Sequence, residues 1–151
     1  MSEQLEVCVQ SRVEVLGLAA KARSSAMASG LAPRYAQELS LVIAELGMNA
    51  LRHGGGLGQV LVKVSAESWM VEVLDGGAGL TPQVLADAGR SDHLGPSGVR
   101  RAGDGLMSFG SGLASVRRLS SRLELSNRLG GGARAVAHRE FLQVSRKGAA
   151  P

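Results

Sequence analysis

The distribution of glycine along this chain constrains its fold more than any other feature. Sixteen of the 21 glycines among the 151 residues fall in four short stretches, 54–58, 76–79, 95–112 and 130–132. The segments between these stretches are apolar and periodic and contain almost no glycine. Glycine is needed where a backbone turns sharply or comes very close to another group. The pattern therefore predicts regular elements joined by glycine-rich turns, which are either ordinary surface loops or the backbone of a ligand site.

Composition indicates a folded domain with an aliphatic core. Hydrophobic residues make up 44% of the chain, charged residues 20% and aromatic residues only 3%. The length suits one domain with one core. The formal net charge of +4 permits an anionic partner such as a nucleotide or an acidic protein. Nucleic acid is disfavoured, because aromatic side chains for base stacking are scarce.

Several segment types are missing from the sequence. No stretch approaches the roughly 20 apolar residues of a membrane span, and residues 1–4 lack the layout of a signal peptide. Cys8, the single cysteine, cannot form an internal disulfide, which fits a reducing compartment. We therefore expect a cytoplasmic protein that does not contact membranes, with Cys8 as a small core residue on a strand.

The spacing of apolar residues predicts the order of the secondary structure. Strands are expected at 5–9, 60–64, 69–74, 123–126 and 133–139, and helices at 13–29, 33–53, 82–88 and 112–122. Residues 89–111 show no periodicity and are interpreted as a long lid loop. This order predicts an α+β fold, a two-layer α/β sandwich with a mixed sheet packed on helices. We expect one domain over residues 1–144, followed by a flexible tail at 145–151.

Three groups of residues could carry chemistry. Glu45 and Asn49 lie four residues apart on the helix predicted at 33–53, so both project from one face, and His53 continues the row. An Asn oxygen suits Mg²⁺, which takes few protein ligands and keeps water and phosphate oxygens. Taken alone, the pair fits an exposed polar face better than a metal site.

The other two groups are glycine-rich. Asp75 ends an apolar strand and is followed by Gly76-Gly77-Ala78-Gly79. A carboxylate there could accept a hydrogen bond from the amino group of a purine, although a strand-ending turn explains the same residues. The run Gly110-Ser111-Gly112-Leu113 precedes a predicted helix, and backbone N–H groups at a helix N-terminus bind phosphate.

Together these three groups resemble the sequence boxes of the GHKL, or Bergerat-fold, ATPases, which include gyrase, Hsp90, histidine kinases and MutL. Residues 45–53 (ELGMNALRH) resemble the N box, residues 75–79 the first glycine box, and residues 110–113 the second. Order and spacing match, and the resemblance covers nearly the whole chain. Within the superfamily the chain is most similar to the anti-sigma-factor serine/threonine kinases and related switch kinases.

The resemblance implies a Bergerat fold and an ATP site with Mg²⁺ under a lid. It implies Glu45 as the general base on a substrate serine hydroxyl, Asn49 as the Mg²⁺ ligand and Asp75 as the adenine reader. Residues expected around the bound nucleotide are Asn49, His53, Asp75, Gly77, Gly79, Gly110, Ser111, Gly112 and Leu113. The implied partner is a STAS-domain anti-sigma-factor antagonist, with a sigma factor or a phosphatase as further candidates and a homodimer as an open option.

The chain departs from the family pattern in its last turn. Members usually have Gly-Thr there, and the hydroxyl supports the adenine-reading Asp; here Ala133 follows Gly132. The predicted lid, with Arg90, Arg100 and Arg101, is also longer than the compact version of switch kinases. These departures motivate an alternative, a nucleotide-binding regulatory module that acts by protein binding without phosphotransfer. A detached histidine-kinase catalytic domain is a further alternative.

Overall fold

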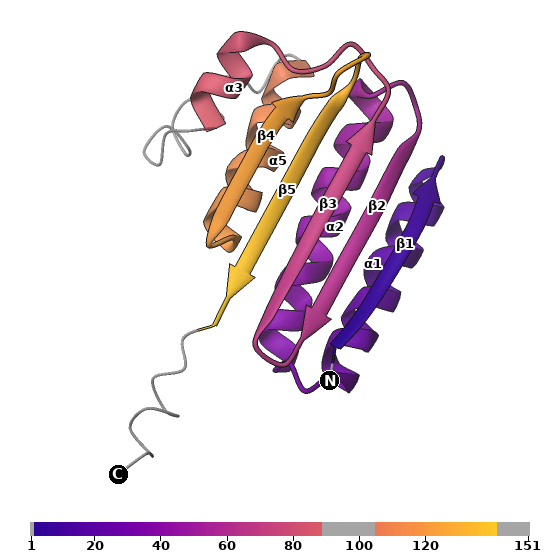
Figure 1. Ribbon diagram of the computed structural model, residues 1–151, viewed down its shortest axis with the longest axis vertical. Coiled ribbons are helices and arrows are strands. Elements are labelled where there is room, and N and C mark those ends of the chain that lie inside the picture. The colour runs from indigo at the N-terminus through magenta and orange to yellow at the C-terminus, as the bar shows by residue number, and fades with distance from the viewer. Residues whose placement is uncertain (1, 89–104, 142–151) are drawn as a thin grey trace.

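The computed structural model describes residues 2–88 and 105–141. Its strands are β1 (Ser2–Val9), β2 (Gly58–Ser65), β3 (Ser68–Asp75), β4 (Arg122–Asn127) and β5 (Ala133–Glu140). Its helices are α1 (Arg12–Ala28), α2 (Pro33–His53), α3 (Pro82–Ala88) and α5 (Gly105–Leu119). The five strands form one sheet in the order β1-β2-β3-β5-β4 (Figure 1).

Every pair of neighbouring strands in the sheet is antiparallel. The expectation of a mixed sheet was therefore wrong in this detail. Two helices separate β1 from β2, so the chain enters β2 running opposite to β1. Helices α3 and α5 lie between β3 and β4. Strands β3 and β4 run in the same direction, but β5 lies between them and pairs antiparallel with both.

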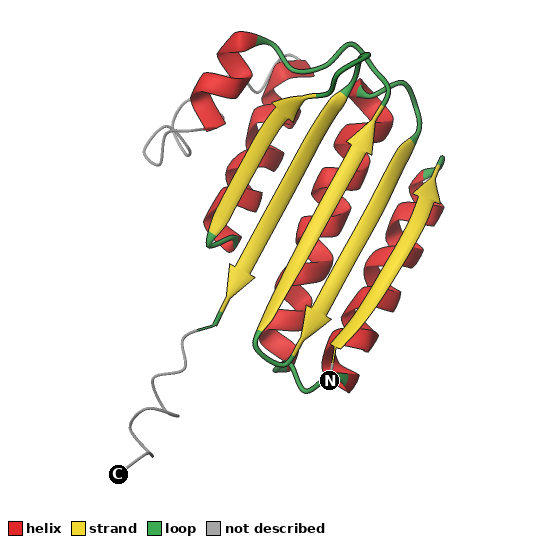
Figure 2. Ribbon diagram, in the orientation of Figure 1, coloured by secondary structure: helices red, strands yellow, loops and turns green. Residues whose placement is uncertain are grey.

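The helices α1, α2 and α5 lie side by side on one face of the sheet, as Figure 2 shows, and the other face carries no helix among the described residues. This arrangement confirms the predicted two-layer α+β sandwich. The short helix α3 lies at the end of the sheet where β3 finishes (Figure 1). No helix of the described residues is both long and apolar enough to cross a membrane.

Local sequence explains the limits of the central helix, α2. Pro33 occupies the start of the helix, where its missing N–H costs nothing. At the other end the Gly54 N–H donates to the Ala50 carbonyl oxygen and closes the last turn. The predicted limits of 33–53 are therefore confirmed, and they fix Glu45, Asn49 and His53 along one helix.

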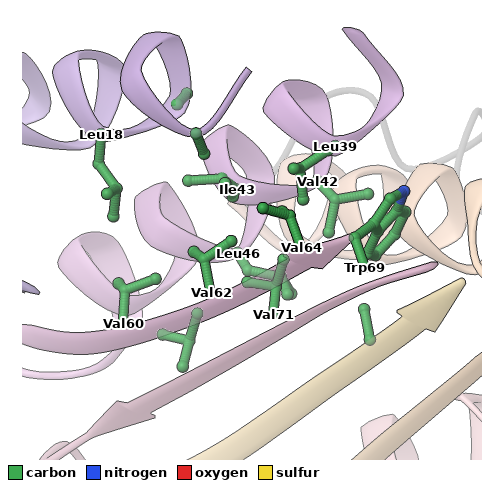
Figure 3. Packing of buried hydrophobic residues seen from close by; sticks show 14 of the residues in the cluster. Leu18, Leu39, Val42, Ile43, Leu46, Val60, Val62, Val64, Trp69 and Val71 are labelled. Carbon is green, nitrogen blue, oxygen red and sulfur yellow. The ribbon is translucent and has the colours of Figure 1, made fainter. Parts of the chain in front are cut away.

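The core lies between the helices α1 and α2 and the inward faces of β2 and β3 (Figure 3). Val60, Val62 and Val64 alternate inward on β2, and Trp69, Val71 and Val73 do so on β3; all are at most 4% exposed. Leu39, Val42, Ile43 and Leu46 of α2 pack on them. Burying a side chain of this size stabilises a fold by about 1.5–3 kcal/mol. This core holds α2 rigidly against the strand that ends in Asp75.

Two further expectations need correction. Helix α5 begins at Gly105 and not at Gly112, so residues 105–111 of the predicted lid are helical; residues 89–104 and the tail at 145–151 lie outside the described part. Cys8 is on a strand as expected but is exposed, because Val7 and Val9 take the inward positions of β1 and alternation turns Cys8 outward.

A candidate nucleotide-binding site

A mainly apolar pocket lies where the C-terminal half of α2 meets the ends of β3, β4 and β5, with α3 and α5 on its sides. Its apolar lining consists of Leu46, Ala50, Val73, Leu80, Val84, Leu113, Leu125, Ala133 and Ala135. Its polar side chains are Asn49, His53, Asp75 and Thr81, and Gly79 completes the lining. An apolar cavity with a few convergent polar groups is the usual form of a small-molecule site.

Asp75 is held in this pocket by two backbone hydrogen bonds. It follows Val71 and Val73 on the inward face of β3, so strand alternation directs it toward the helices. Its Oδ1 accepts hydrogen bonds from the N–H of Gly77, at 3.0 Å, and from the N–H of Ala133, at 3.1 Å. These bonds hold the carboxylate in one orientation and leave Oδ2 as an acceptor for a ligand.

The hydrogen bond from Ala133 to Asp75 comes from the position where the family pattern has a threonine. Ala133 has no hydroxyl, but its backbone N–H reaches Asp75 from β5, so the carboxylate is supported from that side by the main chain. The Arg128 guanidinium adds a bond from Nη1 to the Asp75 carbonyl oxygen, at 2.6 Å. The turn between β4 and β5 therefore holds the end of β3 through both its side chain and its backbone.

Glycines allow the backbone to pack tightly around Asp75. A Cβ at Gly132, where φ is +97°, would overlap the carbonyl oxygen of Asp75, and a Cβ at Gly54 would overlap the Asp75 side chain. A Cβ at Gly77 would lie 2.7 Å from the carbonyl oxygen of His53. Gly77 therefore packs against the end of α2 and does not line the pocket.

Asn49 and Glu45 occupy successive turns of α2. Asn49 is only 8% exposed, and its Nδ2 is buried without a hydrogen-bond partner. A buried amide without a partner costs free energy, so this residue type at this place favours a ligand that completes its bonding. Glu45 is half-buried and makes no hydrogen bond or ion pair with another described residue; it does not line the pocket itself.

The residues around Asn49 fit a Mg²⁺ ion that would be held jointly by the protein and by the phosphates of a bound nucleotide. The described residues contain no cluster of three or more His, Cys, Asp or Glu side chains that could hold a metal alone. The buried amide of Asn49 could supply one oxygen ligand, with the Nδ2 and Oδ1 positions exchanged if required. Mg²⁺ accepts such a sparse protein contribution when phosphates and water fill its other positions.

Helix α5 lies directly over this pair. A Cβ at Gly112 would be 2.5 Å from Oε1 of Glu45 and 3.7 Å from Nδ2 of Asn49. Because α5 begins at Gly105, Gly110, Ser111 and Gly112 are inside the helix and not ahead of it. The expectation that they form a helix N-terminus was therefore wrong for this conformation, since N–H groups within a helix already bond to preceding carbonyls.

His53 is the last residue of α2 and lines the pocket beside Asp75. Partial burial lowers the pKa of His53 below its usual value of 6.5, and the positive charge of Arg52 lowers it further; the negative charge of Asp75 opposes both. The site thus favours a neutral imidazole at neutral pH.

The structure brings Asn49, His53, Asp75, Gly79 and Leu113 together in the pocket lining, and places Glu45 and Gly112 in contact beside it. Sequence reasoning missed most of the apolar wall and Thr81. The spacing of residues in the sequence could have identified part of this wall. Leu46 and Ala50 share the helix face of Asn49 and His53, and Val73 precedes Asp75 by two residues on β3.

The five-stranded antiparallel sheet is covered on one face by helices, and Asp75 and Asn49 line an apolar pocket at one end of it. The sequence model of the "Histidine kinase-, DNA gyrase B-, and HSP90-like ATPase" family matches residues 35–141. The chain therefore belongs to this family, the GHKL ATPases.

Comparison with solved structures agrees with this fold. The chain is similar to one in the crystal structure of the SiaB-SiaC complex from Pseudomonas aeruginosa, with 16% sequence identity and a TM-score of 0.61. The match covers 89% of this chain and 88% of the other. No curated protein sequence matches the chain.

Proposed function

We propose that this protein binds ATP with Mg²⁺ in the pocket between α2 and the ends of β3 and β5. The observation that carries the proposal is the orientation of Asp75 by two backbone N–H groups on an apolar wall. A carboxylate held this way accepts a hydrogen bond from an exocyclic amino group, and the surrounding aliphatic side chains suit the faces of a base. The buried amide of Asn49 stands at the end where the phosphates and their metal would lie.

We further propose that the protein is a serine/threonine kinase of the anti-sigma-factor type. Glu45 would take the proton from a serine hydroxyl of the substrate while that oxygen attacks the γ-phosphorus. The bond between the γ-phosphorus and the bridging oxygen would break, and ADP would leave with the negative charge. Glu45 suits this task because it has no ion-pair partner among the described residues and lies one turn from Asn49. Bound Mg²⁺ would neutralise charge on the transferred phosphoryl group.

The proposed substrate is a STAS-domain antagonist in a cytoplasmic partner-switching pathway. Two observations support a protein partner: the resemblance of the sequence to switch kinases, and the structural similarity to a chain in the crystal structure of a two-protein complex, SiaB-SiaC. A sigma factor, a phosphatase and a second copy of this chain are further proposed partners.

One observation favours a second candidate, a regulatory module that binds nucleotide without phosphotransfer. Gly112 of α5 lies against Glu45, and the N–H groups of the second glycine box are inside the helix. In this conformation Asp75 would still be available to a base, but the second glycine box, residues 110–113, does not form a phosphate-binding turn. Transfer of phosphate would then require the N-terminal part of α5 to unwind.

Calorimetry and a transfer assay on the full chain test both candidates. We expect ATP and ADP to bind in the presence of Mg²⁺, and the antagonist to acquire phosphoserine. Glu45→Gln should leave nucleotide affinity within about twofold and lower the transfer rate by about 10²–10⁴-fold, the usual contribution of a general base. Glu6→Gln is the matched control, because Glu6 is exposed on β1.

The outcomes separate the proposals. Nucleotide binding without transfer to an antagonist favours the regulatory module. Full transfer by Glu45→Gln contradicts the role of Glu45 alone. Absence of any ATP or ADP binding contradicts both candidate functions.

A further inference from the structure

The pocket contains one side-chain hydroxyl among its described lining residues, that of Thr81. Its Oγ1 accepts a hydrogen bond from the N–H of Val84, at 3.2 Å, which caps the first turn of α3. An oxygen that accepts this bond still carries its own proton. The Thr81 hydroxyl donates that proton to no other described residue.

The chemistry of the other pocket residues makes this donor significant. Asp75 can only accept when ionised, and β5 presents the methyl groups of Ala133 and Ala135. A nucleoside also carries acceptors, its ring nitrogens and ribose oxygens, which need donors when they are removed from water. Asn49 and His53 carry N–H donors on α2, and Thr81 adds a hydroxyl donor on the segment of chain that follows β3.

The position of Thr81 is fixed from outside the pocket by Asn127, at the end of β4. Asn127 Oδ1 accepts from the N–H of Leu80 at 2.6 Å, and its Nδ2 donates to the Leu80 carbonyl oxygen at 3.0 Å. The side chain thus pairs with the Leu80 backbone as a neighbouring strand would. A Cβ at Gly79, where φ is +88°, would lie 2.7 Å from Asn127 Oδ1, so glycine is needed for this close approach.

We propose that Thr81 is a nucleoside-contacting, specificity-determining residue of this pocket, and that Asn127 is the residue that positions it. The side-chain hydroxyl makes the contact, and the N-terminus of the short helix α3 has no part in it. The inference rests on the proposed nucleotide binding and goes beyond it, because it names a second polar contact, opposite in character to Asp75.

The test is a double-mutant cycle between Thr81 and the ligand, measured by calorimetry on the full chain. The ligands are ATP, its 1-deaza, 3-deaza and 7-deaza analogues, and 2′-deoxy-ATP and 3′-deoxy-ATP. Thr81→Val should weaken ATP binding by about 3- to 10-fold, the effect of one neutral hydrogen bond. Thr81→Ser keeps the hydroxyl and should stay within about twofold of the wild type, as should Gln83→Ala on the exposed side of α3.

The analogues separate a ligand contact from loss of the helix cap. If Thr81 contacts the nucleoside, one analogue lacks the contacted atom. The wild type should bind that analogue more weakly than ATP, by the same factor by which Thr81→Val weakens ATP binding. Thr81→Val itself should bind that analogue and ATP with equal affinity. If every analogue weakens the wild type and Thr81→Val equally, the hydroxyl serves only as a cap and the proposal is overturned. Wild-type binding of ATP must be present in either case; its absence overturns the proposed function as well.

Asn127→Ala provides the test of positioning. It should reduce the coupling between Thr81 and that analogue and raise the hydrogen-exchange rate of the Leu80 amide. Ser126→Ala, the exposed neighbour on β4, should change neither quantity. Unchanged coupling in Asn127→Ala would remove Asn127 from the proposal and leave Thr81 to stand alone.

Discussion

The pocket has two ends, one at Asp75 and one at Asn49, which lies beside Glu45; we call them the Asp75 end and the Glu45 end. They differ in how far hydrogen bonds within the protein orient their polar side chains. At the Asp75 end, backbone N–H groups of Gly77 and Ala133 orient the carboxylate, and Arg128 holds the strand carbonyl. At the Glu45 end, the buried amide nitrogen of Asn49 has no partner. The Asp75 carboxylate is thus oriented by hydrogen bonds within the protein, whereas the Asn49 amide nitrogen is not.

The two ends also differ in the elements that form them. The Asp75 end is built from β3, β5 and the turn between β4 and β5, which are fixed by sheet hydrogen bonds. The Glu45 end is covered by the helical form of the second glycine box, with Gly112 against the Glu45 carboxylate. The proposed base site is therefore formed before any ligand binds, whereas the proposed phosphate site at the second glycine box requires the start of α5 to change.

The largest effect is expected from a substitution at Gly132 that disrupts the close packing of the backbone at the Asp75 end. Gly132→Ala introduces both a positive φ of +97° on an L-residue and an overlap with the Asp75 carbonyl oxygen. We expect a loss of about 3 kcal/mol or more in the free energy of unfolding, since left-handed strain alone costs about 1–2 kcal/mol. Urea denaturation measures it.

Gly131→Ala is the matched control for that prediction. Gly131 has φ +113° in the same turn, but a Cβ there meets no atom within 4 Å. It should cost only the strain of about 1–2 kcal/mol. Equal losses in the two variants would show that the close packing on Asp75 contributes nothing.

The second-largest effect is expected for Asp75→Asn, which should weaken ligand binding while leaving the stability of the fold nearly unchanged. Asp75→Asn can keep an oxygen that accepts from Gly77 and Ala133, but it puts an NH₂ group where the second carboxylate oxygen was. We expect stability within about 1 kcal/mol of wild type and ATP affinity lower by about 30-fold, corresponding to about 2 kcal/mol for a charge-assisted hydrogen bond. Calorimetry and thermal unfolding measured together check this, and an unchanged affinity would contradict the role of Asp75 as base reader.

These two ends were also unequally predictable from the sequence. The limits of α2 and the hairpin of β2 and β3 follow from apolar spacing at helical and strand periods, and the structure agrees. The support of Asp75 by the Ala133 N–H could not be predicted, because every residue but proline carries an N–H and no sequence signal marks which one reaches a carboxylate.

The start of α5 was missed for a different reason. Glycine has a low helix propensity, about 1 kcal/mol worse than alanine, and Gly105, Gly110 and Gly112 argue against a helix there. The structure nevertheless continues the helix through them. Thr81 was overlooked because its importance depends on a tertiary contact, the pairing of Asn127 with Leu80 across 47 residues of chain.

A smaller effect is expected from filling the contact at the Glu45 end. Gly112→Ala places a methyl group near Glu45 Oε1, the tip of a flexible side chain that can move aside. Greater helix propensity offsets that displacement, so we expect a stability change below about 1 kcal/mol. The rate of phosphotransfer should fall by about 10-fold, since the carboxylate is moved from its place.

Gly17→Ala is the control for Gly112→Ala, because Gly17 is helical in α1 and a Cβ there meets nothing within 4 Å. It should show the gain in helix propensity with no change in transfer. If Gly112→Ala loses several kcal/mol like Gly132→Ala, the Glu45 end is as rigid as the Asp75 end, and the contrast between them fails.

The smallest effect concerns His53, whose pKa is lowered below 6.5 mainly by burial, then by Arg52, against the opposing charge of Asp75. As pH falls through 6.5, the unfolded chain takes up a proton on this imidazole before the folded protein does, so stability decreases as pH falls. Removing the titration with His53→Gln should make the drop in melting temperature between pH 7.5 and pH 5.5 smaller. In the Asp75→Asn background the opposing charge is gone, so the His53 contribution to that drop should increase. A contribution that stays the same in both backgrounds would mean that the Asp75 carboxylate does not influence the neighbouring imidazole.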